Sequence, residues 1–464
     1  MDEEDRLSSL PDSLLVEILS LLPLNNAAAT SALSHRWVSL WTQLPRLKID
    51  SDIPIFDLDS DSCKERFHES IATFNHILQH LTSPNIHTFD LHFHYPNLDI
   101  EQFNVCSASL ISWIPLLCVR NPAILKVGSV ILQNTGRHFI TLPSCIFETH
   151  SIVNLDLCGF FYCKLPESGI VNLPNLKTLS FFAVDFDPKV LRTLFKSCPL
   201  LETLCLRLDL GEDQVLDISA PKLNFLTIGM TGPSYRSKIV IDAPLLEVMA
   251  LIDCVALYSF VNIPPNLQKA TIQFFDPEKV GVYLTSIPDL LQGISKAKSI
   301  TFGNNLAVFN DLNPEDANVW SLFCNLTHLK LVLDKEYGDW GATIPSCLLN
   351  KLKSIELCAM NGDEDDVESV KYILGNANVL DKLHITPFAN PRRYGRSVLW
   401  KEYKFCGDLF TLPRISVTCK IEFDGVYFRA SSYGPQNESG CSEIDWLKSQ
   451  TWPALNEDDD ESDE

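Results

Sequence analysis

A short apolar pattern, repeated along most of the 464-residue chain, limits the possible folds more than any other feature. Each copy reads apolar-x-x-apolar-x-apolar, which describes a strand with alternating side chains, preceded by one further apolar residue. Between Val127 and Leu267 successive copies begin at steps of 25, 24, 25, 22, 23 and 21 residues. The clear copies are Ile86/Phe89/Leu91, Val127/Val130/Leu132, Ile152/Leu155/Leu157, Leu176/Leu179/Phe181, Leu201/Leu204/Leu206, Leu223/Leu226/Ile228 and Leu246/Met249/Leu251.

Wider copies continue the pattern toward the C-terminus. Their steps of 30, 29, 26 and 28 residues leave room for a helix in each repeat. These copies are Leu267/Ala270/Ile272, Ala297/Ile300/Phe302, Leu326/Leu329/Leu331, Leu352/Ile355/Leu357 and Leu380/Leu383/Ile385. One repeat cannot bury its apolar face, whereas a stack of repeats can. The period is that of leucine-rich repeats, so we expect an α/β solenoid with a curved parallel sheet.

Two amphipathic helices are predicted ahead of the regular repeats. Within Lys64–Leu81 the apolar residues Phe67, Ile71, Phe74 and Leu78 recur at helical spacing. Ser109–Val119 places Trp113, Leu116 and Leu117 on one helical side. The acidic, turn-rich residues 51–62 indicate a linker or exposed loop before them.

The N-terminal stretch Leu10–Trp41 has a different texture and predicts three short helices. Pro11 and Asp12 suit a first helical turn, and Pro23 ends that helix. Asn25 or Asn26 can cap a second helix rich in alanine. A third helix would place Trp37, Leu40, Trp41 and Leu44 on one face. A module of about 40 residues buries little apolar surface by itself. It is therefore expected either to cap the following domain or to dock on a partner.

The residues of this module resemble the F-box motif of plant proteins. The matching elements are Leu10-Pro11-Asp12, Leu14-Leu15, Ile18-Leu19, Leu22-Pro23 and Leu33-Ser34-x-Arg36-Trp37-x-x-Leu40-Trp41, with His35 where the family usually has Lys. The resemblance implies binding to a Skp1-type adaptor and, through it, to a cullin. The residues expected to supply the adaptor surface, or the small core behind it, are Leu10, Pro11, Leu14, Leu15, Ile18, Leu19, Leu22, Pro23, Trp37, Leu40 and Trp41.

Later segments resemble other parts of plant F-box/leucine-rich-repeat proteins. The phrases Ile218–Leu226 and Ile241–Met249 repeat one another as such repeats do, and Ile344–Ile385 resembles the FBD region. The expected organisation is an F-box (5–50), a linker and helical entry with the first strand (51–125), the solenoid (126–343), the FBD region closing it (344–425) and a C-terminal segment with a disordered acidic tail (426–464).

Composition excludes several classes of function. The net charge is −22, of which seven negative charges fall in residues 456–464, and this balance disfavours binding to nucleic acid or to an anionic membrane. We find no secretory signal and no apolar run long enough to span a membrane. The 15 cysteines are then expected to be reduced thiols in an intracellular protein, in the cytoplasm, the nucleus or both.

Catalytic signatures are not found. The sequence contains no phosphate-binding loop, dinucleotide fingerprint, HExxH or GxSxG motif. The acidic run Asp363–Asp366 is expected to be a solvated turn, since it lacks the spacing of a calcium loop. We therefore expect no catalytic, cofactor or metal site.

These features favour the substrate-recognition subunit of an SCF-type E3 ubiquitin ligase, a non-enzymatic role in which the F-box binds Skp1 and the repeats hold a protein target. The alternative is an F-box/leucine-rich-repeat scaffold that acts outside a ubiquitin ligase. A receptor for a small molecule on the concave face is a third hypothesis, to which the overall acidity gives no support.

Overall fold

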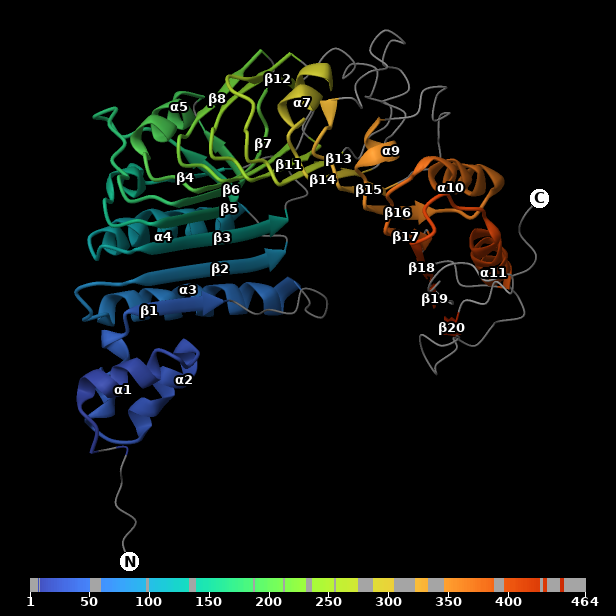
Figure 1. Ribbon diagram of the computed structural model, residues 1–464. Coiled ribbons are helices and arrows are strands. Elements are labelled where there is room, and N and C mark those ends of the chain that lie inside the picture. Colours follow the sequence, from blue (N-terminus) through green and yellow to red (C-terminus); the bar gives the residue numbers. More distant parts are fainter. Residues whose placement is uncertain are drawn as a thin grey trace, which may run out of the picture. The chain divides into compact units, whose positions relative to one another are not determined.

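The computed structural model describes residues 7, 9–50, 60–96, 100–132, 139–186, 188–211, 213–230, 236–253, 256–273, 287–303, 322–332, 346–387, 396–425, 429–431 and 443–445. The chain divides into two compact units, residues 1–232 and 233–464, which we describe separately. Within each unit parallel strands lie side by side in sequence order, with helices among them (Figure 1).

The first unit begins with the helical module and continues directly into a parallel sheet. The helices of the module are α1 (Asp12–Leu19) and α2 (Leu24–Ala29), followed by 3₁₀ turns at Thr30–Ala32, Trp37–Ser39 and Trp41–Gln43. The strands of this sheet are β1 (Arg46–Asp50), β2 (Thr88–Pro96), β3 (Ile124–Leu132), β5 (Asn154–Cys163), β6 (Thr178–Phe186), β7 (Thr203–Leu208) and β9 (Phe225–Met230), in sequence order. The short strand β4 (Ile140–Leu142) pairs with the end of β5, and β8 (Val215–Ser219) is not part of this sheet. The remaining helices are α3 (Ser60–His80), α4 (Ile100–Cys118), a 3₁₀ helix at Ser144–Glu148 and α5 (Pro188–Ser197).

One face of the first sheet is a continuous apolar layer. Adjacent strands pair in register, so residues at equivalent strand positions lie side by side. The first buried row is Leu47, Phe89, Leu125, Leu155, Leu179, Leu204 and Leu226. The second is Ile49, Leu91, Val127, Leu157, Phe181, Leu206 and Ile228. This stacking is how repeats that are individually too small obtain a common core.

The predicted repeat register holds except at one strand. In β3 the residues opposite Phe89 and Leu91 are Leu125 and Val127, so the predicted copy Val127/Val130/Leu132 was out of register. The local run Ile124–Leu132 contains apolar residues at many positions, and only the pairing with β2 selects the correct ones.

A further repeat, which the prediction missed, precedes the expected first copy. Leu44, Leu47 and Ile49 have the repeat spacing and are all buried, and the last two pair with β2. The prediction had placed Leu44 on a third helix, but the structure has 3₁₀ turns there. The backbone of Leu44 is extended because Pro45 disfavours a helical conformation in the preceding residue.

Other helical predictions are confirmed with adjustments. Helix α3 buries Phe67, Ile71, Phe74 and Leu78 as expected, and residues 51–59 of the predicted linker lie outside the described residues. In α4 Trp113 and Leu117 are buried, but Leu116 is 48% exposed and was wrongly placed with them. Helix α2 starts at Leu24 after Pro23, so the two asparagines lie within its first turn and do not cap it.

The second unit repeats the same plan. Its strands are β10 (Lys238–Asp242), β11 (Val248–Ile252), β12 (Leu257–Phe260), β13 (Lys269–Gln273), β14 (Ser299–Gly303), β15 (His328–Val332), β16 (Ser354–Met360), β17 (Lys382–Pro387), β18 (Lys420–Asp424), β19 (Arg429–Ser431) and β20 (Glu443–Asp445). Its helices are α7 (Ile287–Gly293), α9 (Ser346–Asn350), α10 (Glu364–Asn376) and α11 (Arg396–Thr411). Strands β11 and β13–β18 are parallel in sequence order, whereas β19 and β20 are antiparallel.

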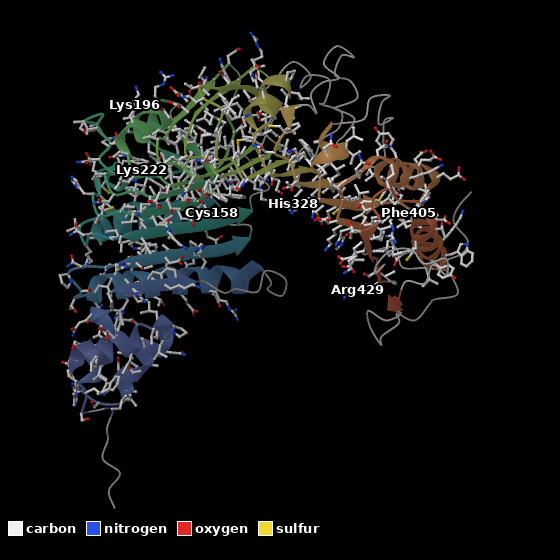
Figure 2. All side chains as sticks on the ribbon, viewed as in Figure 1. Cys158, Lys196, Lys222, His328, Phe405 and Arg429 are labelled. Atoms are coloured by element: carbon white, nitrogen blue, oxygen red, sulfur yellow. The ribbon has the colours of Figure 1, made fainter. Side chains whose placement is uncertain are left out.

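The core of the second unit lies beneath its parallel strands. The buried positions at the C-terminal end of this sheet are Ile355 and Leu357, Leu383 and Ile385, then Ile421 and Phe423. Helix α11 contributes Phe405, labelled in Figure 2, whose ring meets that of Phe423 edge to face at 6.0 Å between centroids. Phe405 also packs against Gly362, where any side chain would be strained by a φ of 75°.

The acidic run Asp363–Asp366 begins α10, and the predicted solvated turn is only partly confirmed, since its first three residues are exposed and the fourth is buried. Asp363 caps the helix by accepting a hydrogen bond from the Asp366 amide at 3.0 Å. Asp366 is itself fully buried and accepts a hydrogen bond from the Gly362 amide at 2.7 Å. The two carboxylates therefore fix the start of a helix, which is a structural use of the run.

Candidate functional site

The first candidate surface is the outer face of α1. Leu15 and Leu19 are buried, whereas Leu14 is 44% exposed and Ile18 is 40% exposed. Beyond the end of the helix Leu21 and Leu22 are 78% and 42% exposed. Large apolar side chains gathered on one face of a short helix are typical of a protein contact surface.

The residues predicted to form the adaptor surface or its core fall into three groups. Those with exposed side chains are Pro11, Leu14, Ile18, Leu22 and Pro23. Those that are half-buried are Leu10 and Trp41. Those that are buried are Leu15, Leu19, Trp37 and Leu40. The structure thus separates side chains that a partner could reach from side chains that hold the module together.

Sequence reasoning missed other exposed apolar residues of the helical module. They are Leu21, at 78% exposure, Leu33 at 63% and Val38 at 50%. Leu21 follows the helix end, so helical spacing could not assign it to a face. Leu33 belongs to the matching motif, but its spacing from the other apolar residues does not indicate that its side chain is exposed.

Arg36 fixes the N-terminal end of α1. Its Nε donates a hydrogen bond to Asp12 Oδ1 at 2.8 Å, and one terminal nitrogen donates to the Leu10 carbonyl at 2.5 Å. The guanidinium therefore ties the turn before Trp37 to the first residues of the helix. This contact explains why an arginine at this position helps to present the α1 face.

The helical module is joined to the sheet by direct hydrogen bonds. The Thr82 amide donates to the Thr42 carbonyl at 2.9 Å, and the hydroxyls of the two threonines lie 2.8 Å apart. The His87 amide donates to the Pro45 carbonyl at 2.7 Å. Because β1 follows Pro45 without a break and pairs with β2, the module and the first repeat form one packed piece.

A groove lies where α1 approaches the start of the sheet. It has a volume of about 630 Å³, and its lining residues are Leu10, Leu14, Glu17, Ile18, Ser20, Leu21, Pro45, Arg46 and His87. The wall from α1 is mainly apolar, and the wall from the first repeat carries the exposed Arg46 and His87.

The solvent-facing side of the first sheet is the second candidate surface. His92 Nε2 lies 2.8 Å from Asp90 Oδ1, and the His92 ring occupies the space above Gly128 on the next strand. Further along, the Arg207 guanidinium stacks over the ring of Phe182 at 4.8 Å, and that ring is 43% exposed. This side therefore offers both polar and aromatic groups to a partner.

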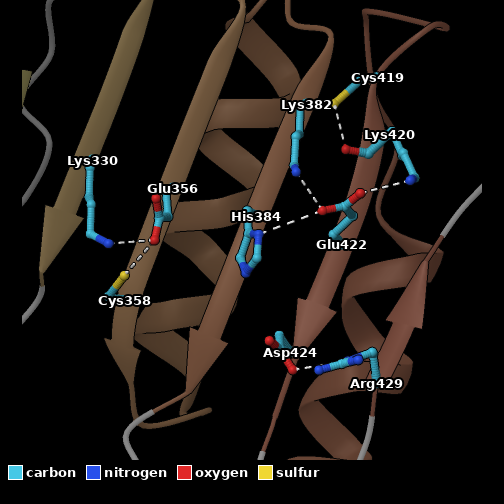
Figure 3. A network of polar contacts seen from close by, with 10 residues as sticks. All are labelled: Lys330, Glu356, Cys358, Lys382, His384, Cys419, Lys420, Glu422, Asp424 and Arg429. Carbon is cyan, nitrogen blue, oxygen red and sulfur yellow. Dashed lines mark hydrogen bonds and ion pairs between the residues drawn. The ribbon is translucent and has the colours of Figure 1, made fainter. Parts of the chain in front are cut away.

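The corresponding side of the second sheet carries a network of charges, shown in Figure 3. Lys330 Nζ lies 2.5 Å from Glu356 Oε1. Burial alone would raise the pKa of Glu356, but the hydrogen bonds from Lys330 and Cys358 and the nearby positive charges together outweigh it and lower that pKa. The network presents alternating charges on neighbouring strands, which favours a partner of complementary charge pattern.

Glu422 is the most strongly perturbed member of this network. Its carboxylate lies 2.6 Å from Lys382 Nζ and 2.7 Å from Lys420 Nζ, with His384 Nδ1 at 3.6 Å. Hydrogen bonds from the two lysines lower the pKa of Glu422 to about 2. One carboxylate thus faces two ammonium groups.

The described residues were searched for side chains that could hold a metal ion. They contain no group of three or more metal-ligating side chains. Burial raises the pKa of the thiols of Cys106, Cys163 and Cys198 to about 12, so they are unreactive near neutral pH. Across the same described ranges, no helix combines the length and apolar character needed to cross a bilayer. The surfaces found are suited to binding proteins.

Comparisons with known proteins agree with the three parts of the chain. Residues 7–49 match the F-box domain, residues 113–263 match the LRR repeats of FBD-associated F-box protein At5g56370, and residues 342–385 match the FBD domain.

Whole-chain relatives come from Arabidopsis thaliana. F-box/LRR-repeat protein 13 is 28% identical over 462 residues, which covers 90% of this chain and 96% of the relative. F-box/FBD/LRR-repeat protein At3g52680 is 29% identical over 463 residues, which covers 92% of this chain and 96% of the relative. The match therefore extends over nearly the full length of both proteins.

Proposed function

The chain is an F-box/LRR/FBD protein in its domain content and order, and from this premise we propose that it is the target-binding subunit of an SCF-type ubiquitin ligase. The F-box would bind a Skp1-type adaptor, which connects to a cullin. The solenoid would bind a protein to be ubiquitinated, and the other subunits would perform the chemistry. Such an assembly acts in the cytoplasm or the nucleus.

The exposed apolar face of α1 is the observation that carries this proposal. Leu14 and Ile18 are accessible, while the neighbouring Leu15 and Leu19 already fill the core of the module. A second partner is therefore needed to remove Leu14 and Ile18 from water. Pro11, Leu22 and Pro23 would extend the adaptor contact, and Trp37 and Leu40 would act from behind as core residues.

The mechanism is tethering in a fixed geometry. The hydrogen bonds between Thr42 and Thr82, and between His87 and Pro45, join the F-box to the first repeat. A target held on the first sheet would then keep one orientation toward the adaptor. Holding both partners makes ubiquitin transfer effectively intramolecular, at effective concentrations of about millimolar.

Target binding would use the solvent-facing sides of the parallel sheets. These sides vary from residue to residue, with Asp90 and His92 on one strand, and Phe182 and Arg207 on others. The buried side is nearly uniform in character. A protein partner that is recognised specifically must therefore contact the variable side.

Affinity purification with neddylation blocked would test the proposal. The intact chain is expected to co-purify Skp1 and cullin, whereas Leu14→Asp combined with Ile18→Asp is expected to lose both while retaining the target. The matched control is Leu116→Asp, which changes an equally exposed leucine on α4, away from the F-box. Deleting residues 1–50 would be less informative, since it would also remove β1 from the sheet.

Two results would contradict the proposal. Retention of Skp1 by the doubly substituted chain would show that the α1 face is not the adaptor surface. Recovery of Skp1 without cullin, under conditions that preserve other SCF complexes, would favour a scaffold acting outside a ubiquitin ligase.

A further inference from the structure

We propose that the adaptor contacts the start of the sheet as well as the helices of the F-box, by seating a helix in the groove between them. This helix would turn apolar side chains toward α1 and a carboxylate toward Arg46. The inference rests on the proposed function for the identity of the partner. It adds a second contact region, formed by Pro45, Arg46 and His87, that lies outside the helices of the F-box.

The apolar wall of the groove is continuous with the exposed face of α1. Leu14 and Ile18 belong to both, so a partner that covers the α1 face already reaches the groove. Leu21 extends this wall and is 78% exposed. A leucine so exposed beside two others indicates an apolar contact that the chain alone leaves uncovered.

The opposite wall is held in place by the sheet. Arg46 begins β1 and pairs with Thr88, and the His87 amide is hydrogen-bonded to the Pro45 carbonyl at 2.7 Å. The backbone of this wall is therefore held by the sheet. A groove preformed in this way binds a partner helix without paying for ordering its walls.

The size and charge of the groove favour a helix with one acidic edge. A volume of about 630 Å³ holds several apolar side chains, and both walls are reached from solvent. The α1 wall carries Glu17, which would repel an incoming carboxylate, whereas the repeat wall carries Arg46. An acidic residue of the partner is thus directed to the repeat side.

Two neighbouring cations on β1 provide a matched comparison. Arg46 and Lys48 are both exposed and alternate with the buried Leu47, so their side chains leave the same side of the strand. Arg46 lines the groove, and Lys48 is outside its lining. Charge reversal at each position therefore makes the same change to net charge but affects the groove only at Arg46.

The experiment measures binding of the full chain to a purified plant Skp1-type adaptor by biolayer interferometry. Leu21→Ala and Arg46→Glu are each expected to weaken binding by about tenfold, as for residues that matter in an interface. Lys48→Glu is expected to change it by less than about twofold. Raising the salt concentration should reduce the difference between Arg46→Glu and the unchanged chain, because it screens the charge contact.

Each other outcome contradicts a distinct part of the argument. If Arg46→Glu behaves like Lys48→Glu, the adaptor does not reach the start of the sheet, although the proposed function stands. If the unchanged chain does not bind the adaptor, the proposed function fails as well. If the chain dimerises without adaptor and Leu21→Asp abolishes the dimer, the occupant of the groove is a second copy, and the inference is wrong.

Discussion

Leu14 and Leu15 are adjacent in sequence, and substituting them tests which side chains of α1 stabilise the module and which bind a partner. Leu15 is fully buried, whereas Leu14 and Ile18 remain 44% and 40% exposed. We therefore expect opposite signatures from Leu15→Ala and from the double substitution Leu14→Ala, Ile18→Ala. The first should reduce the stability of the module, and the second should reduce its affinity for the adaptor.

The magnitudes follow from burial. Truncating a buried leucine to alanine costs about 2–5 kcal/mol in unfolding free energy, so Leu15→Ala should destabilise the module by that amount. Burying a whole leucine or isoleucine side chain is worth about 1.5–3 kcal/mol. Scaling this by exposures of 44% and 40% gives about 1.3–2.5 kcal/mol for Leu14 and Ile18 together if the partner covers them fully. That corresponds to roughly a 10- to 70-fold loss of affinity.

Two measurements on the same purified proteins separate the effects. Urea unfolding, followed by the fluorescence of Trp37 and Trp41, reports on the module, with other tryptophans replaced by phenylalanine in the reference protein. Calorimetric titration with the adaptor gives the affinity. The reasoning is refuted if the double substitution destabilises the module as much as Leu15→Ala does, or if it leaves the affinity unchanged.

Three further predictions concern the sheets and the FBD domain. Burial raises the pKa of Asp366 from 3.8 to about 6, so stability is lost as pH rises from about 4 to about 6, and Asp366→Asn should recover about 1–3 kcal/mol at pH 7.5 but less at pH 5 in chemical unfolding. Gly128→Ala would place a Cβ 2.3 Å from His92 Nδ1 and should destabilise by about 1–3 kcal/mol, a loss that adding His92→Ala removes in thermal unfolding. The Glu422 carboxyl should titrate near pH 2 by NMR, and Lys382→Met should raise this pKa toward 4.5; an unchanged titration would contradict the assigned contact.

The repeats could be predicted because each strand must place apolar side chains at the same two buried positions. Leu204 and Leu206 face Leu226 and Ile228, and each pair must be apolar to continue the core. That demand survives even in degenerate repeats. In β3 several alternative pairs of positions are apolar, so the sequence did not determine which pair is buried, and the pairing with β2 shows the register.

The start of the sheet was missed because two patterns overlap. Trp37, Leu40, Trp41 and Leu44 have helical spacing, while Leu44, Leu47 and Ile49 have the spacing of a repeat. The deciding residue is Pro45, which holds the backbone of Leu44 in an extended conformation. Because Pro45 disfavours a helix at Leu44, it indicates that the helical module ends there and that β1 follows directly.

The sequence could not show which apolar residues of α1 are buried and which are exposed, for a different reason. Helical periodicity places Leu14, Leu15, Ile18 and Leu19 on one broad apolar stripe, and it cannot say which edge of the stripe the module covers itself. The answer depends on where the turn at Trp41–Gln43 packs against α1, a contact between residues more than 20 positions apart in sequence. The same limit applies to Arg36, whose bond to Asp12 spans 24 positions.

The burial that makes the fold predictable gives no information about the proposed target. Buried positions in neighbouring repeats must resemble one another, so they carry information about stacking and little about binding. The solvent-facing positions are released from that demand, and they differ from strand to strand: an Asp–His pair on β2, an exposed Phe on β6 and a carboxylate between two lysines at β17 and β18. Because stacking does not fix these side chains, they are the positions at which the proposed target could be recognised. Substitutions on this side, such as Phe182→Ala or Glu422→Gln, should therefore alter target binding while leaving adaptor binding intact.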